Sequence, residues 1–139
     1  MLGFYAVRKL IEAKKLSDAT ANQTLSLARY PLRPGKRVTY MNWHRVEELY
    51  DISAPCDESR DVLQICNQVI HSYVFVLGFA DTGGFANVLF ASDRDRHDGI
   101  FLITAQQIID LFDAVGTDYP ASTQMTWDER VGDYRVSNK

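Results

Sequence analysis

The chain has 139 residues, of which 46% are hydrophobic and 12% aromatic, so it is long enough to bury the core of one globular domain. Its formal net charge of −3 provides no general positive field for a polyanion, which disfavours a dedicated nucleic-acid-binding protein. No segment approaches the ~20 apolar residues that span a bilayer, and charges at Arg8 and Lys9 interrupt the N-terminal apolar run before a signal peptide could form. We therefore expect a single cytoplasmic domain over residues 1–139.

The N-terminal third is predicted to contain two helices and an outer hairpin. Apolar residues over 4–11 recur at helical spacing, which predicts a first helix that ends near Leu16. Extended runs over 24–30 and 37–41 flank a Pro-Gly loop, and together they predict the hairpin. Asn42 is a candidate N-cap for a short helix whose apolar residues point inward, namely Trp43, Val46, Leu49 and Tyr50.

The middle of the chain carries the clearest pattern. Ser59 is predicted to cap a helix in which the apolar residues from Val62 to Tyr73 repeat along one face. Three nearly continuous apolar runs follow, over 74–80, 86–91 and 100–103, and such strands are normally covered on both faces. Their short connections predict an antiparallel three-strand meander over about 74–103.

The C-terminal third predicts one more helix and a terminal hairpin. Thr104 and Gln107 form a capping-box pattern, and the helix after them is expected to end at Gly116 and to bury Ile108, Ile109, Phe112 and Val115. Segments around 125–127 and 134–136 flank a turn that contains Gly132. The sequence as a whole predicts an α+β fold with a mainly antiparallel sheet packed by three to four helices.

The residues that could carry cofactor, metal or nucleophile chemistry form no established pattern. Cys56 and Cys66 are not a Cys-x-x-Cys pair and indicate reduced thiols in an intracellular protein. The glycine-rich nucleotide loops, the nucleophile elbow and the His-Glu-x-x-His motif are absent, and we predict no cofactor.

The segment over 93–99 contains three carboxylates and one imidazole, a density that could hold a cation. Its order differs from a calcium-binding EF-hand, because the sixth and twelfth positions from Asp93 are Asp98 and Thr104 instead of Gly and Glu. Arg94 and Arg96 also neutralise the acidic residues, so we predict a salt-bridged surface loop and no metal site.

The tripeptide Asp81-Thr82-Gly83 resembles the active-site motif of the aspartic proteases. The resemblance implies a homodimer in which two such motifs supply a carboxylate pair that shares one proton. The hydrophobic-Gly motif of the retroviral-type enzymes does not follow Gly84, and the same residues suit a tight turn between two strands. We interpret the segment as a turn.

A polar stripe is predicted on the helix from Ser59. Arg60, Gln64, Asn67 and His71 recur at i, i+4, i+7 and i+11, opposite its apolar face. The segment 66–71 resembles the Arg, polar residue and His cadence of HEPN-class helical RNases, which implies phosphodiester chemistry. Cys66 stands where the Arg belongs, so that activity is not transferred. The alternative is a solvated helix surface with a His near the helix C-terminus.

These features predict a non-enzymatic interaction or ligand-binding protein, for instance a small acidic partner or inhibitor of another macromolecule, or a homodimer. The stripe is one candidate binding surface, and a second is an acidic surface that would meet a basic partner, formed by Asp93, Asp95, Asp98, Asp110 and Asp113. One alternative is a small hydrolase or phosphodiesterase that uses His71 and Asn67. Another is a sensor domain with an apolar pocket between sheet and helices.

Overall fold

The computed structural model describes residues 1–139 and contains a five-stranded antiparallel sheet in the order β2-β1-β5-β4-β3. The strands of this sheet are β1 (Thr24–Pro31), β2 (Cys56–Asp61), β3 (Ser72–Phe79), β4 (Phe85–Ser92) and β5 (Gly99–Thr104). The helices are α1 (Leu2–Glu12), α2 (Asp18–Ala21), α3 (Val46–Leu49), α4 (Val62–Ile70) and α5 (Ala105–Gly116). A separate hairpin consists of β6 (Thr123–Asp128) and β7 (Asp133–Asn138).

The α+β class and the antiparallel sheet agree with the prediction, whereas the five helices exceed the three to four expected. The additional element is α2, a single turn in a segment that was predicted only to close the first helix. The Ser17 hydroxyl accepts a hydrogen bond from the Thr20 N–H at 3.3 Å and thereby caps this turn. α1 itself ends at Glu12, and Lys14 follows it with a φ of 53°.

The predicted meander is confirmed by the pairing of β3, β4 and β5. Phe75 pairs with Phe90, which in turn pairs with Phe101 across the next pair of strands. The segment 81–84 forms the turn between β3 and β4, in which Gly83 has a φ of 86° and donates its N–H to the Ala80 carbonyl at 2.8 Å.

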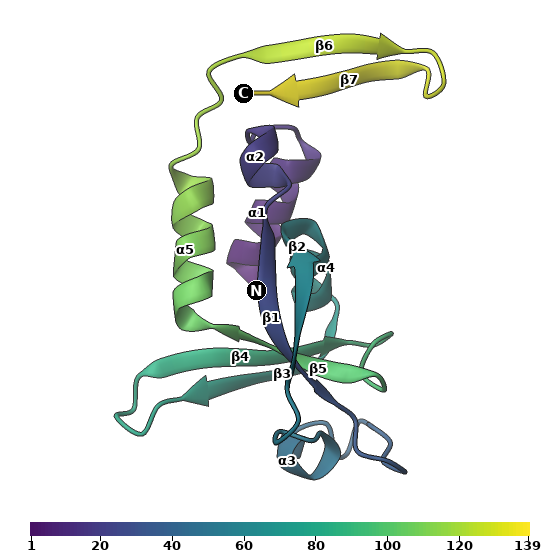
Figure 1. The fold of residues 1–139 in the computed structure, drawn as a ribbon, viewed down its shortest axis with the longest axis vertical. Helices are drawn as coiled ribbons and strands as arrows, with labels where there is room; N and C mark the ends of the chain where they lie inside the picture. Colours follow the sequence, from purple (N-terminus) through teal and green to yellow (C-terminus); the bar gives the residue numbers. More distant parts are fainter.

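Apolar side chains are buried on both faces of the sheet, because successive strand residues point to opposite sides. On one face Phe90 and Phe101 pack with residues of α1, α4 and α5. On the other face Ala91 and Ile100 pack with α3 and the segment before it. Figure 1 shows α1, α4 and α5 on one side of the central strands and α3 on the other. This arrangement explains why the predicted strands read as nearly continuous apolar runs.

The predicted outer hairpin is wrong. Both sides of β1 are occupied, by β2 and by β5, and residues 37–41 form no strand. Asn42 is not an N-cap, since α3 begins after Arg45. The Asn42 side chain instead accepts from the Thr39 N–H at 2.7 Å and donates to the Arg37 carbonyl at 3.0 Å, which stabilises the turn before α3.

The predicted start of the central helix at Ser59 is also wrong. Ser59 lies in β2, and α4 begins after Asp61, whose carboxylate accepts from the Gln64 N–H at 2.7 Å. Arg60 therefore lies on a strand, and Tyr73 lies in β3. The helix starts later than predicted because Ser59 is paired with Ser26 of β1, which leaves Asp61 to accept from one of the unpaired N–H groups of the first turn.

The predicted capping box of α5 is present, with the Thr104 side chain and the Gln107 backbone N–H 3.1 Å apart. Ile109, predicted to be buried, is 51% exposed. It lies outside the i, i+3, i+4, i+7 face that α5 turns to the core, formed by Ile108, Leu111, Phe112 and Val115.

The predicted terminal hairpin is present as β6 and β7, with Gly132 at a φ of 69° in its turn. It contacts the rest of the chain near its base (Figure 1). The Asn138 side chain donates to the carbonyls of Lys14 and Leu16 at 2.9 and 3.0 Å. The Ser137 hydroxyl donates to Asp18 at 2.6 Å, and this hydrogen bond lowers the pKa of Asp18. None of the helices combines the length and apolar content needed to cross a membrane.

Candidate functional site

A polar pocket of about 590 Å³ lies beside α4. None of its nine lining residues is hydrophobic. The predicted stripe residues all line it, together with two residues of the predicted acidic surface and three others: Arg60, Gln64, Asn67, Gln68, His71, Ser92, Asp93, Arg94 and Asp95. We refer to this set as the polar pocket.

Two local features of the fold form this pocket. The buried face of α4 includes Ile65 and Val69, which turns Gln64, Asn67 and His71 away from the core. The β3–β4 hairpin then returns the chain to the end of α4, because Ser72 at the start of β3 pairs with Ser92 at the end of β4. The turn after Ser92 is thereby placed next to His71.

Gln68 connects α4 to this turn. Its side-chain oxygen accepts from the Ser92 N–H at 3.3 Å, and its side-chain nitrogen donates to the Asp95 carboxylate. The Ser92 hydroxyl also donates to Asp95 at 3.0 Å. The charge of Asp95 is therefore already stabilised by hydrogen bonds within the protein.

The same turn is held from the other side of the sheet. Tyr50 is fully buried and donates its hydroxyl to the Arg96 carbonyl at 2.8 Å. Burial raises the pKa of Tyr50, so the hydroxyl stays protonated as a donor. The Arg96 guanidinium lies 3.8 Å from the centre of the Tyr73 ring and forms an ion pair with Asp93. Both pocket carboxylates are thus engaged by neighbouring groups.

Arg60 reaches the pocket from β2. It forms an ion pair with Glu58, and its guanidinium carbon lies 5.3 Å from the centre of the Phe101 ring. Because Phe101 is only 2% exposed, this contact ties the position of Arg60 to the hydrophobic core.

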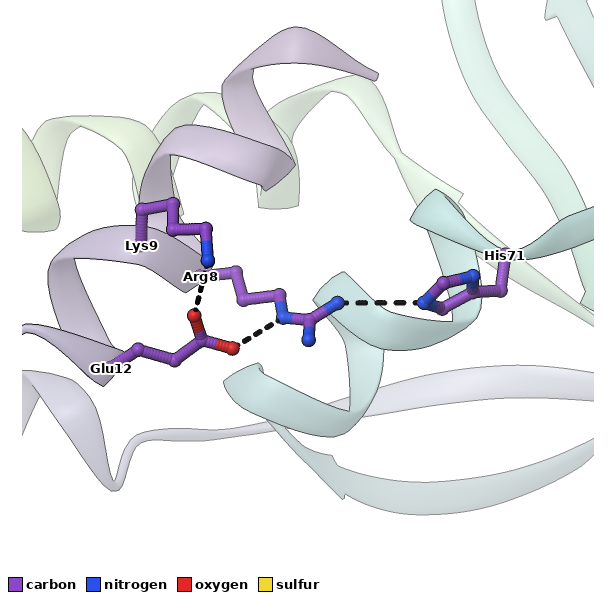
Figure 2. A network of polar contacts seen from close by, with 4 residues as sticks. All are labelled: Arg8, Lys9, Glu12 and His71. Atoms are coloured by element: carbon purple, nitrogen blue, oxygen red, sulfur yellow. Dashed lines mark hydrogen bonds and ion pairs between the residues drawn. The ribbon is translucent and has the colours of Figure 1, made fainter.

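Arg8 of α1 contacts His71 at the end of α4 (Figure 2). Its Nη1 lies 3.4 Å from His71 Nε2, and a guanidinium can only donate. The contact brings a cation of α1 next to the imidazole at the end of α4. Arg8 also pairs with Glu12 at 2.7 Å, as does Lys9 at 2.8 Å, and these contacts lower the pKa of Glu12.

The side chains of Gln64, Asn67 and Arg94 make no hydrogen bond or ion pair within the protein, and Asn67 Oδ1 is buried without a partner. Arg94 is exposed at the pocket and is not neutralised by any carboxylate. The hydrogen-bonding groups left for a ligand therefore include these two amides, the Arg94 guanidinium and the Nε of Arg60, which is buried without a partner.

The remaining acidic candidates lie elsewhere. Asp98 is in the loop before β5, whereas Asp110 and Asp113 are exposed on α5, which follows β5. Asp110 accepts from the Gln106 side chain at 2.7 Å. The structure thus separates the predicted acidic surface into two groups at opposite ends of β5. No three His, Cys, Asp or Glu side chains are grouped as metal ligands.

A second cavity, of about 490 Å³, lies on the face of the sheet covered by α3. Its lining includes the apolar residues Val76, Leu89 and Leu102 together with charged residues of the α3 segment such as Arg45 and Glu48. Arg45 and Glu48 form an ion pair at 3.6 Å. This cavity lies between the sheet and α3. The alternative prediction of a sensor domain places an apolar ligand pocket in such a position.

The sequence did not identify Arg8, Gln68, Ser92 or Arg94 as site residues. The predicted β3–β4 hairpin could have indicated Ser92 and Arg94, because its pairing brings the turn after Ser92 to the end of α4. Arg8 had no such signal. In the comparisons with known proteins, no family model, no curated protein and no solved structure matches this chain.

Proposed function

We propose that this protein binds a small anionic ligand, rich in hydrogen-bond acceptors, in the polar pocket. The observation that supports this proposal is that the carboxylates of the pocket are engaged by neighbouring groups, whereas several of its hydrogen-bond donors are not. Asp93 and Asp95 are engaged by Arg96, Gln68 and Ser92. The donors of Arg94 and of the Gln64 amide remain free to interact with a ligand, and Arg60 Nε is a buried donor without a partner.

The size and lining of the pocket support a small polar ligand over a lipid. Its volume of about 590 Å³ falls within the roughly 300–1,000 Å³ of small-molecule sites. Such sites are usually lined by apolar residues, whereas this one has none. A ligand there would gain its affinity from charge-assisted hydrogen bonds, which phosphate and carboxylate groups form well with arginine.

Isothermal titration calorimetry with inorganic phosphate, pyrophosphate and citrate tests the proposal and separates phosphate from carboxylate recognition. We expect at least one of these probes to bind and Arg94→Gln to weaken that binding by about tenfold or more, since a hydrogen bond to a charged group contributes about 1.5–3 kcal/mol. The matched control is Arg130→Gln, an exposed arginine in the β6–β7 turn without an ion pair. Absence of binding by all three probes, or equal losses in both variants, would contradict the proposal.

A second candidate function is phosphodiester hydrolysis by His71 in the same pocket. The contact with Arg8 supports it, because it places a guanidinium, which can stabilise negative charge, beside an imidazole, the side chain that most often transfers protons in enzymes. Asn67 precedes His71 by one helical turn and could orient the substrate.

Hydrolysis of bis-p-nitrophenyl phosphate tests this second function. If the wild type turns over, we expect His71→Ala to lower the rate about a hundredfold or more while the fold is retained, in line with general acid-base catalysis. His97→Ala is the control, since His97 is exposed in the loop between β4 and β5 and does not line the pocket. An inactive wild type that still binds a probe would eliminate catalysis and retain ligand binding. A cytoplasmic location remains part of the proposal, supported by two free thiols.

A further inference from the structure

The two edges of the five-stranded sheet differ sharply in charge. β2 forms one edge, and four of its six residues are charged. β3 forms the other edge with the sequence Ser-Tyr-Val-Phe-Val-Leu-Gly-Phe, which contains no charged residue and no proline. Charges and prolines are the usual means by which proteins prevent edge strands from pairing with other chains. Only the β2 edge carries this protection.

The β3 edge is also unoccupied. β3 pairs with β4 on one side, and no other strand or side chain forms a hydrogen bond with its backbone on the other. Two large apolar side chains at this edge are in contact with solvent, Leu77 with 49% exposure and Phe79 with 64%. The outer N–H and C=O groups of β3 are therefore available for a further strand.

We propose that β3 pairs antiparallel with β3 of a second copy of this chain, about a two-fold axis that passes through Val76. The β3–β4 register is regular over residues 74–78 and irregular on either side, between Ser72 and Val74 and between Gly78 and Phe79. Val76 is the centre of the regular segment. The pairing produces a continuous ten-stranded sheet from two five-stranded sheets.

A second copy fits this edge better than an unrelated strand for two reasons. A two-fold axis perpendicular to the sheet keeps each side chain on its own face, so Leu77 of one copy lies opposite Phe75 of the other and apolar groups meet apolar groups. In addition, the resulting dimer has only the charged β2 strands at its two outer edges, so assembly stops at two copies. A strand from an unrelated protein would instead leave that protein's own sheet edge exposed, with nothing in this chain to stop further pairing.

The expected dimer is weak. One pair of short strands buries less than the roughly 1,200–2,000 Å² of a standard protein interface. Its dissociation should therefore be followed by sedimentation velocity across roughly 1–500 µM, a range suited to weak complexes. We expect the wild type to pass from monomer to dimer within this range.

Leu77→Lys tests which surface forms the dimer. The substitution introduces a charge next to the two-fold axis in both copies, and we expect it to raise the dissociation constant by about tenfold or more. The control is Ile109→Lys on α5, where the original side chain is 51% exposed, close to the 49% of Leu77. Circular dichroism establishes that both variants are folded, and titration with the anion that the wild type binds shows whether the polar pocket is unaffected.

Hydrogen exchange gives a second measurement that does not depend on a variant. We expect the outward amides within 74–78 to exchange more slowly at high protein concentration than at low concentration. A wild type that stays monomeric throughout, or a dimer that survives Leu77→Lys with unprotected β3 amides, overturns the proposal. The latter outcome would assign the contact to another apolar surface, such as Met125, Trp127 and Tyr134 of the terminal hairpin. The dimer and the ligand-binding proposal are independent. If the protein does not dimerise, ligand binding in the polar pocket is still tested by the anion titration.

Discussion

Replacing Phe90 by alanine is expected to lower the free energy of unfolding by about 3–5 kcal/mol, the usual loss for a buried phenylalanine. Phe90 is 1% exposed in the core between the sheet and the helices α1, α4 and α5. Its ring centre lies 6.0 Å from that of Phe101 at an interplanar angle of 30°, so the substitution also removes an aromatic contact. Equilibrium urea unfolding measures the change.

The control for this prediction is an aromatic side chain outside the core. Tyr119 is 85% exposed, and Tyr119→Ala is expected to change the free energy of unfolding by about 0.5 kcal/mol or less. Similar losses from the two substitutions would show that Phe90 does not occupy the core described above. Phe90 also supports the polar pocket indirectly, because it stacks on Phe101, and the Phe101 ring in turn contacts the Arg60 guanidinium.

The second large expected effect is a difference in reactivity between the two thiols, Cys66 and Cys56. Cys66 is fully buried on α4, and burial raises its pKa from the usual 9.0 to about 12, whereas Cys56 is exposed. Because the thiolate is the reactive form, a thiol of pKa about 12 is roughly a thousandfold less ionised at pH 8 than one of pKa 9.0. We expect Cys66 to react with a disulfide reagent about a thousandfold more slowly in the folded protein than in the unfolded chain, and the exposed Cys56 to react readily in both. Rates in the Cys56→Ser and Cys66→Ala variants measure each thiol alone.

Unfolding in urea should make the two thiols react at similar rates, which is the control for intrinsic reactivity. A rapid native-state reaction of Cys66 would contradict its placement in the core of α4.

The same thiol predicts a loss of stability at alkaline pH. Below pH 9 the Cys66 thiol is protonated in both states, so its contribution is fully present. Between pH 9 and 12 the unfolded chain releases the proton while the folded protein retains it, and the free energy of unfolding falls. At pH 10.5 the loss relative to Cys66→Ala should reach about 2 kcal/mol, at about 1.4 kcal/mol for each pH unit above 9.

Elements with local signals were predictable from the sequence. The meander, the capping box of α5 and the terminal hairpin each depend on residues close together in the chain. β2 was not predictable, because Cys56–Asp61 has no apolar alternation and is kept extended by pairing with β1. Its contacts include the Arg29–Glu58 ion pair at 3.5 Å, which joins residues far apart in sequence.

The candidate site was predictable in part. Helical periodicity identified Gln64, Asn67 and His71 as outward-facing neighbours, and the structure places all three in one pocket. Arg60 lines the same pocket from β2, so its predicted place on the helix was wrong. Arg8 depends on the packing of α1 against α4, and no sequence spacing encodes that contact.

The most direct test of ligand binding in the polar pocket is a titration with phosphate, pyrophosphate and citrate in turn, followed by amide chemical shifts in ¹⁵N–¹H NMR spectra. The account predicts saturable shifts at Gln64, Asn67, His71 and Arg94, with no comparable change at Val76 and Leu89 of the second cavity. Spectra without saturable shifts for any of the three anions, or with shifts confined to the second cavity, would contradict it.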